Sequence, residues 1–451
     1  MGDLGMTNGE IWAQVRAQAE LTPAVYGAVD FDMLPERFTG TPGEPNDLSS
    51  AGEEIRNRIL ADTALVDRMR AYTFMGDRIA DRYAALMPQY GFRGLVQMLV
   101  QACDGGIEAV KDAPEELAAF IGAMERVPAW LDMNLVEEGA RVERAEVAVV
   151  SPYSLRAAFI ATFMNKYAAL PMALTGTLSN ENAARRVKET ATFFSTSVLP
   201  GALARGGAGF KAAAMVRLMH SMVRFNAMRK GRWDVSVYGV PIPQVDQMPA
   251  GLIGITLMAT KMVQAGRTEF TRQERARVEL SRYRCYLLGL PEPLLGTTPE
   301  EIVTLMAARQ ATLRSGFDDA TCGALLRATI GAYLPSDRTW RSRLFDTFER
   351  GFSKILFVKQ FLAGDMGRAA EIGVRIGGFD RFAFAACAAI IATRLGAYRL
   401  AGRLPFLAGL ADRRLVATIE RQLAALGHAH FESDASSYRP AVPARQGATH
   451  P

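Results

Sequence analysis

The sequence predicts an all-α protein that folds as a single large helical domain. Strong helix formers are plentiful from about residue 51 onward, and apolar residues recur there at spacings of three and four, as on one face of a helix. Helix-start signals precede several of these segments. No segment combines sustained apolar–polar alternation with β-branched enrichment, so we expect no sheet.

The elements can be justified in order along the chain. Residues 1–50 are rich in Gly, Pro and Thr and predict an irregular N-terminal extension. Residues 51–430 predict the helical domain. Within it, residues 53–74 place apolar side chains at helical intervals, "APEELAAFIGAMERV" opens with a proline and two acids, and "TTPEEIVTLMAARQATL" begins with a capping-box pattern. The stretch "WDVSVYGVPIP" is nearest to a strand, but its prolines favour a loop or sheet edge. Residues 431–451 are polar with several prolines and predict a disordered tail.

Composition limits the functional classes. Of 451 residues, 49% are hydrophobic, which is enough for a substantial core. The net charge is only +5 and its signs are interspersed, so nucleic-acid binding is not expected. The four cysteines lie far apart without metal-ligand spacing, which predicts reduced thiols in a cytoplasmic protein; they are Cys103, Cys285, Cys322 and Cys387.

No membrane-crossing segment is expected. The N-terminus lacks the basic and apolar regions of a signal peptide. The longest charge-free run, Thr190 to Ala204, is too short to cross a bilayer and contains Pro200 and Gly201. We therefore expect a soluble protein, and a basic helical protein of this kind is compatible with peripheral contact to an anionic membrane surface.

One histidine stands out within an apolar helix. "VRLMHSMVRF" (Val216–Phe225) contains His220, the sole histidine of the first 427 residues. A helix over about 209–229 places Arg217, His220 and Arg224 on one face. His220 could be a core histidine bonded to a carbonyl, a half-exposed residue at a helix contact, or a ligand. A buried imidazole is costly unless its nitrogens are paired.

The neighbouring arginines favour one particular ligand. Arg217 and Arg224 lie three residues before and four after His220, where they could meet the carboxylates of a group docked beside the imidazole. Haem combines an iron that accepts a neutral imidazole with two propionates that bind cations. The methionines of this helix could line an apolar slot for it, although ordinary core packing is the commoner use of methionine.

Six segments in order resemble a known family. They are "VPAWLDMNLVEEGARV" (127–142), "YAALPMALTGTL" (167–178), "RRVKET" (185–190), "VRLMHSMVRF", "WDVSVYGVPIPQVD" (233–246) and "SRYRCYLLGLPEPLLG" (281–296). Over about residues 60–310 the chain is similar to the haem-dependent oxygenases that include the latex-clearing proteins (rubber oxygenases) and the MpaB-type oxygenases. The resemblance implies a globin-like helical core that holds one haem b.

The resemblance also implies roles for particular residues. His220 would be the proximal iron ligand, and Arg282 would be a further propionate contact. The family's distal R-L-x-K-T motif falls on Arg186, Glu189 and Thr190, so that a glutamate replaces the lysine. A distal carboxylate could act as a general acid–base; alternatively, Glu189 pairs with a neighbouring arginine and never meets the iron.

The implied activity is that of an oxygenase that uses O2 on an apolar, unsaturated or isoprenoid-like substrate, with oxidative C=C cleavage as the family's reaction. The glutamate in place of the distal lysine argues against rubber itself. Three alternatives stay open: a peroxide-using peroxygenase or peroxidase, a non-catalytic carrier of haem or of a hydrophobic ligand, and a helical protein without a cofactor. Neither the substrate nor the oligomeric state can be read from the sequence.

Overall fold

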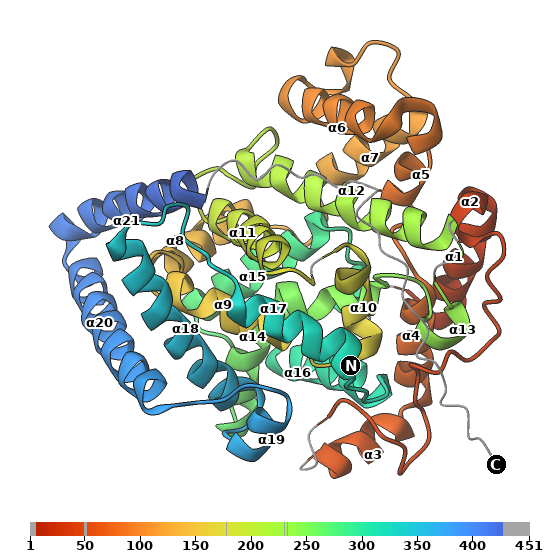
Figure 1. Ribbon diagram of the computed structural model, residues 1–451. Coiled ribbons are helices and arrows are strands. Elements are labelled where there is room, and N and C mark those ends of the chain that lie inside the picture. Colours follow the sequence, from red (N-terminus) through yellow and green to blue (C-terminus); the bar gives the residue numbers. More distant parts are fainter. Residues whose placement is uncertain (1–5, 49–51, 177, 230, 232, 427–451) are drawn as a thin grey trace.

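A computed structural model describes residues 6–48, 52–176, 178–229, 231 and 233–426, and in this part of the chain every regular element is a helix (Figure 1). A single isolated bridge joins Phe38 to Leu313, and no strand forms among the described residues. The predicted all-α class is therefore confirmed. The predicted tail, 431–451, lies outside the described residues.

The expectation of an irregular N-terminal extension is wrong for residues 8–26. Here α1 (Asn8–Leu21) and α2 (Pro23–Tyr26) form, and α1 packs against α4. Thr7 and Glu10 make a reciprocal capping box at the start of α1, and Ile11 is fully buried on its inner face. Residues 27–48 contain no helix. A local cap and an apolar face thus outweigh the Gly and Pro content of the wider segment.

The remaining helices fill the chain to residue 426. They are α3 (Glu53–Ala61), α4 (Thr63–Phe74), α5 (Ala80–Ala84), α6 (Met87–Gly105), α7 (Glu115–Glu125), α8 (Met133–Val149), α9 (Ser151–Ala161), α10 (Lys166–Leu174), α11 (Asn180–Thr196), α12 (Ala208–Arg229), α13 (Val235–Tyr238), α14 (Gln244–Gln264), α15 (Arg272–Leu287), α16 (Pro299–Thr312), α17 (Ala324–Gly331), α18 (Trp340–Phe361), α19 (Met366–Glu371), α20 (Gly378–Arg403) and α21 (Pro405–Leu426).

Local signals explain where several of these helices begin. The segment 53–74 divides at Asp62, whose side chain accepts a hydrogen bond from the backbone N–H of Leu65 and starts α4. Thr298 caps α16 with Pro299 in its first turn, as the sequence predicts. The stretch that most resembled a strand instead forms the one-turn helix α13, because the side chain of Asp234 caps it.

Helix α12 is the central element of the fold. It crosses the molecule beneath α6 and α7 and packs against α2, α5, α6, α11 and α15 (Figure 1). Most of its side chains are buried, including Met215, Met219 and Met222, which belong to the main hydrophobic core. A helix buried on nearly all sides needs partners for every polar side chain it carries, so its arginines and His220 call for specific neighbours.

Helices α20 and α21 form one edge of the molecule, opposite α1 and α2 (Figure 1). Among the described residues, α20 alone has the length and apolar composition to cross a membrane. The charge-free runs in the sequence do not single it out, because Arg394 interrupts its apolar stretch. In the structure α20 lies against α18, α21 and α8.

Candidate functional site

The imidazole of His220 is held in one orientation by two glutamines. Its Nδ1 lies 3.1 Å from Oε1 of Gln247. The amide nitrogen of Gln247 donates to Oε1 of Gln244 at 2.8 Å, and Gln244 in turn donates to the carbonyl of Gly76 at 2.9 Å. Because the oxygen of Gln247 is an acceptor, Nδ1 of His220 must carry the proton and donate it. The lone pair of His220 is therefore on Nε2.

The environment of His220 keeps it neutral. Burial, followed by the positive charges of Arg224 and Arg186, lowers its pKa to about 4, and the hydrogen bond to Gln247 only partly opposes this. At neutral pH the ring is therefore uncharged. Among the described residues none forms a hydrogen bond with Nε2. A neutral imidazole whose Nδ1–H donates to an oxygen, with a free Nε2, is the usual state of a metal-ligating histidine.

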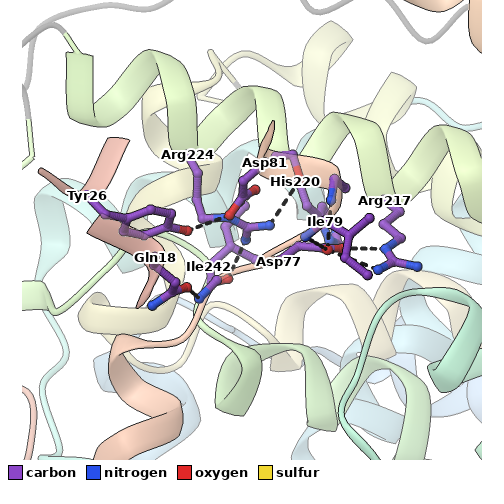
Figure 2. A network of polar contacts seen from close by, with 12 residues as sticks. Gln18, Tyr26, Asp77, Ile79, Asp81, Arg217, His220, Arg224 and Ile242 are labelled. Atoms are coloured by element: carbon purple, nitrogen blue, oxygen red, sulfur yellow. Dashed lines mark hydrogen bonds and ion pairs between the residues drawn. The ribbon is translucent and has the colours of Figure 1, made fainter. Parts of the chain in front are cut away.

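The two arginines that flank His220 have partners within the protein (Figure 2). Arg224 donates from Nε to Asp81 at 2.9 Å, with both side chains fully buried, and Tyr26 donates to the same carboxylate at 2.5 Å. Arg217 forms a bidentate pair with Asp77. The propionate contacts of Arg217 and Arg224 stay predictions; in the structure both guanidinium groups neutralise buried carboxylates.

These ion pairs fasten α12 to the segment around α5. Burial alone would raise the pKa of Asp77, but the charges of Arg217 and Arg224 and the hydrogen bonds to the carboxylate together outweigh it and lower that pKa. Two glycines leave room for these buried polar side chains, because a larger residue at either position would overlap them. A Cβ on Gly289 would lie 2.6 Å from the carboxylate of Asp77, and a Cβ on Gly76 would lie 1.9 Å from the hydroxyl of Tyr26. Local spacing indicates neither pair, since the partners lie more than a hundred residues apart in the chain.

Arg282 also has internal partners. It pairs with Glu279 at 3.3 Å, donates from Nε to the carbonyl of Leu295 at 3.3 Å, and places its guanidinium 4.0 Å from the ring centroid of Trp130. Burial lowers its pKa. The expected propionate role of Arg282 is therefore unsupported here, and its contacts instead join α15 to the residues before α8.

The predicted distal residues lie together on α11. Arg186 donates to Oε2 of Glu189 at 3.0 Å, and Nε of Arg185 lies 4.0 Å from Oε1 of the same carboxylate. Burial raises the pKa of Glu189, while Arg186 and Arg185 act in the opposite direction. Glu189 therefore pairs with neighbouring arginines, which was the alternative to an acid–base role. Thr190, the next residue, is half-buried.

Several buried polar atoms on α11 have no hydrogen-bond partner among the described residues. Oε1 of Glu189 and the Nε atoms of Arg185 and Arg186 are buried and have no hydrogen-bond partner among the described residues. Such atoms are costly to leave unpaired and call for an explanation, such as a missing ligand or water. Helix α11 packs beside α12, and the charge of Arg186 acts on His220. The predicted proximal and distal residues thus lie on adjacent helices.

A cavity of about 580 Å³ opens along α11. Its wall includes Arg185, Lys188 and Glu189, and the segment between α17 and α18 adds Tyr333 and Arg338. The volume is in the range of small-molecule sites, but His220 does not line this cavity. Sequence reasoning missed Tyr333 and Arg338, because nothing in the local pattern ties them to α11. Lys188 lies inside the "RRVKET" segment, which was the available signal.

The donor set suits a porphyrin iron better than a bare metal ion. Among the described residues, no group of three His, Cys, Asp or Glu side chains could hold an ion. The four cysteines are free and buried, and burial raises the pKa of each thiol. A single oriented imidazole is sufficient for haem, because the macrocycle supplies the other nitrogen ligands. His220 and the unpaired polar atoms of α11 therefore fit that group.

Comparisons with known proteins concern the family and the fold. A sequence model of the domain family described as "ER-bound oxygenase mpaB/B'/Rubber oxygenase, catalytic domain" matches residues 110–366. The resemblance was expected over about residues 60–310. The match begins 50 residues after the start of that range and ends 56 residues after its end. The solved structure of latex clearing protein LCP in the closed state is similar in fold, with a TM-score of 0.54 and 17% identity over 78% of this chain and 91% of that one. No curated protein matches.

Proposed function

Because the chain belongs to the family of ER-bound mpaB/B' and rubber oxygenase catalytic domains, we propose that it is a haem b-dependent oxygenase in which His220 is the proximal ligand. The observation that carries the proposal is the state of His220, which is neutral, oriented through Nδ1 by Gln247, and free at Nε2. His220 is half-buried, and the described residues do not enclose its Nε2, so a ligand can reach this nitrogen.

The residues around His220 have defined tasks in this proposal. Gln247 fixes the ring plane and leaves the lone pair on Nε2, and Gln244 fixes Gln247. The buried pairs of Arg217 with Asp77 and of Arg224 with Asp81 hold α12 in register against α5, so that the imidazole cannot shift. When bound, haem would supply the iron centre that activates dioxygen. The protein supplies position, polarity and the exclusion of water.

Glu189 is the proposed proton carrier. Its Oε2 is held by Arg186, whereas its buried Oε1 has no hydrogen-bond partner. Burial raises its pKa, which brings the protonated carboxyl closer to neutral pH and suits a group that must give and take back a proton at Oε1. We assign Arg186 to positioning this carboxyl and Thr190 to a second, hydroxyl contact on the same side.

The proposed substrate is a small apolar, unsaturated molecule, with oxidative cleavage of a C=C bond as the reaction. The family description includes rubber oxygenase, which supports this class. The carboxyl of Glu189 replaces the family's distal lysine, so we do not carry rubber itself over to this chain. The same buried carboxyl favours a second candidate, a peroxide-using peroxygenase, because acid–base help to a peroxide needs such a group.

Turnover of the haem-loaded protein tests the proposal. Oxygen uptake and carbonyl products should be measured with a panel of polyenes and terpenoids, using the full chain, Glu189→Gln, and the control Glu115→Gln at the exposed start of α7. We expect Glu189→Gln to lower turnover by about 100-fold or more and Glu115→Gln to leave it unchanged. Product formed with hydrogen peroxide but not with dioxygen would favour the peroxygenase. Binding without any product would identify a carrier.

A further inference from the structure

The edge of the molecule formed by α20 and α21 exposes an unusual number of large apolar side chains. We call this surface the α20–α21 corner. Phe406 is 77% exposed, Leu400 62% and Phe382 61%. The exposed apolar set of the corner is Phe379, Phe382, Ile390, Leu400, Leu404, Phe406 and Leu410. Single exposed apolar residues are ordinary, but several large ones along the same two helices indicate an interaction surface.

Helix α20 is apolar on both of its faces. Ala383, Cys387 and Ile391 are buried on the inner face, which packs against α18. The outer face continues from Phe382 to Leu400 without an acidic residue. Only 17% of the most apolar stretch of α20 is buried. A helix that is apolar all round normally has a partner on every side, so the outer face lacks one among the described residues.

The corner also carries a net positive charge. Between residues 378 and 426 there are seven arginines and three acidic residues, a net charge of +4, whereas the whole chain carries +5. Two of the three acids are paired with the body of the protein, Asp380 with Lys354 and Asp412 with Arg144. The seven arginines form no ion pair with the described residues; they are Arg381, Arg394, Arg399, Arg403, Arg413, Arg414 and Arg421.

We propose that the α20–α21 corner docks on the surface of an anionic lipid bilayer. The apolar side chains would enter the boundary between headgroups and acyl chains, as in interfacial helices. The arginines that border them, such as Arg399 and Arg403, can extend to lipid phosphates while their aliphatic stems lie along the apolar layer. Helix α20 docks on the bilayer and does not span it, because its inner face is taken up by α18 and Lys354 holds Asp380.

The net positive charge of the corner makes a second copy of the chain an unfavourable partner. A symmetric dimer across this corner would bring two surfaces of net charge +4 together and bury their arginines without acidic partners. An anionic bilayer instead offers opposite charge and an apolar layer in the same plane. The proposal does not depend on haem or on turnover, and it can fail while the oxygenase proposal stands.

Vesicle flotation of the full-length protein tests the docking. Vesicles of phosphatidylcholine alone are compared with vesicles that also contain phosphatidylglycerol. We expect binding to the mixed vesicles, weakened by salt because the attraction is screened. Replacing Arg399 or Arg403 by Gln should weaken binding about five-fold each. Phe406→Glu should weaken it by about ten-fold or more, because a large apolar side chain is lost from the boundary.

A control variant separates the corner from general surface effects. Leu257→Glu alters a similarly apolar side chain, 41% exposed, on α14, which packs against α4, α15 and α16. It should bind like the wild type, and circular dichroism should show every variant folded. The proposal is overturned if the wild type binds neither vesicle, or if Phe406→Glu binds as well as Leu257→Glu. A lipid-free dimer that Phe406→Glu converts to a monomer would also overturn it, by identifying a second copy as the partner.

Discussion

Replacing Gln247 with leucine should weaken haem binding without removing the proposed ligand. Leucine keeps nearly the volume of glutamine but cannot accept the Nδ1 proton of His220. Two hydrogen bonds disappear, the 3.1 Å contact from His220 and the 2.8 Å contact to Gln244. An unpaired buried donor costs about 1–3 kcal/mol. Loss of an outer-shell partner typically lowers metal affinity about 10- to 100-fold, which is the same range.

The assay is a haem titration of the full-length protein, followed by the Soret absorption band. Thr256→Val is the matched control, because Thr256 lies buried on the same helix and donates only to the carbonyl of Leu252, at 2.9 Å. Gln247→Glu should restore affinity, since a carboxylate also accepts from Nδ1, and it should move the position of the band, which a purely structural role would not do. If Gln247→Leu binds haem as tightly as the wild type, Gln247 does not orient the ligand and the reasoning fails.

Two further predictions concern stability. Arg224→Met breaks the fully buried pair with Asp81 and should lower the free energy of unfolding by about 3–5 kcal/mol; Arg272→Met, at the solvent-exposed pair with Glu138, should leave the free energy of unfolding almost unchanged. Chemical denaturation compares them, and equal losses would contradict the assignment. The pKa of His220 is lowered from 6.5 to about 4, so the unfolded chain binds more protons in that window and stability falls as pH drops through it. His220→Ala should flatten this slope, and an unchanged slope would exclude an imidazole that stays neutral in the folded protein.

The sequence predicts the helices well where caps and apolar periodicity coincide. The start of α16 at Thr298 and Pro299 is an example. The N-terminal error has a simple cause: the Gly and Pro content was averaged over fifty residues, which hid the capping box of Thr7 and Glu10. A local test for helix starts would have found α1.

The site was predictable only in part. The spacing of "RRVKET" and "VRLMHSMVRF" was sufficient to select Glu189 and His220, and the structure places their helices side by side. The partners of Arg217 and Arg224 were not predictable, because Asp77 and Asp81 reach them only through the packing of α5 on α12. A positive charge beside a candidate ligand therefore does not by itself indicate an anionic cofactor.

The apolar surface of α20 was missed for a related reason. A search for charge-free runs stops at Arg394, although the helix presents an apolar outer face on both sides of that residue. Whether such a face is buried depends on tertiary packing, which no window along the sequence reports.

The most direct test of the central claim is the absorption spectrum of the purified full-length protein after haem is supplied, compared with that of His220→Ala. We predict a Soret band in the wild type that is weakened or shifted in the variant. A wild-type protein that takes up no haem, or a variant with the same band, would show that His220 does not ligate the iron.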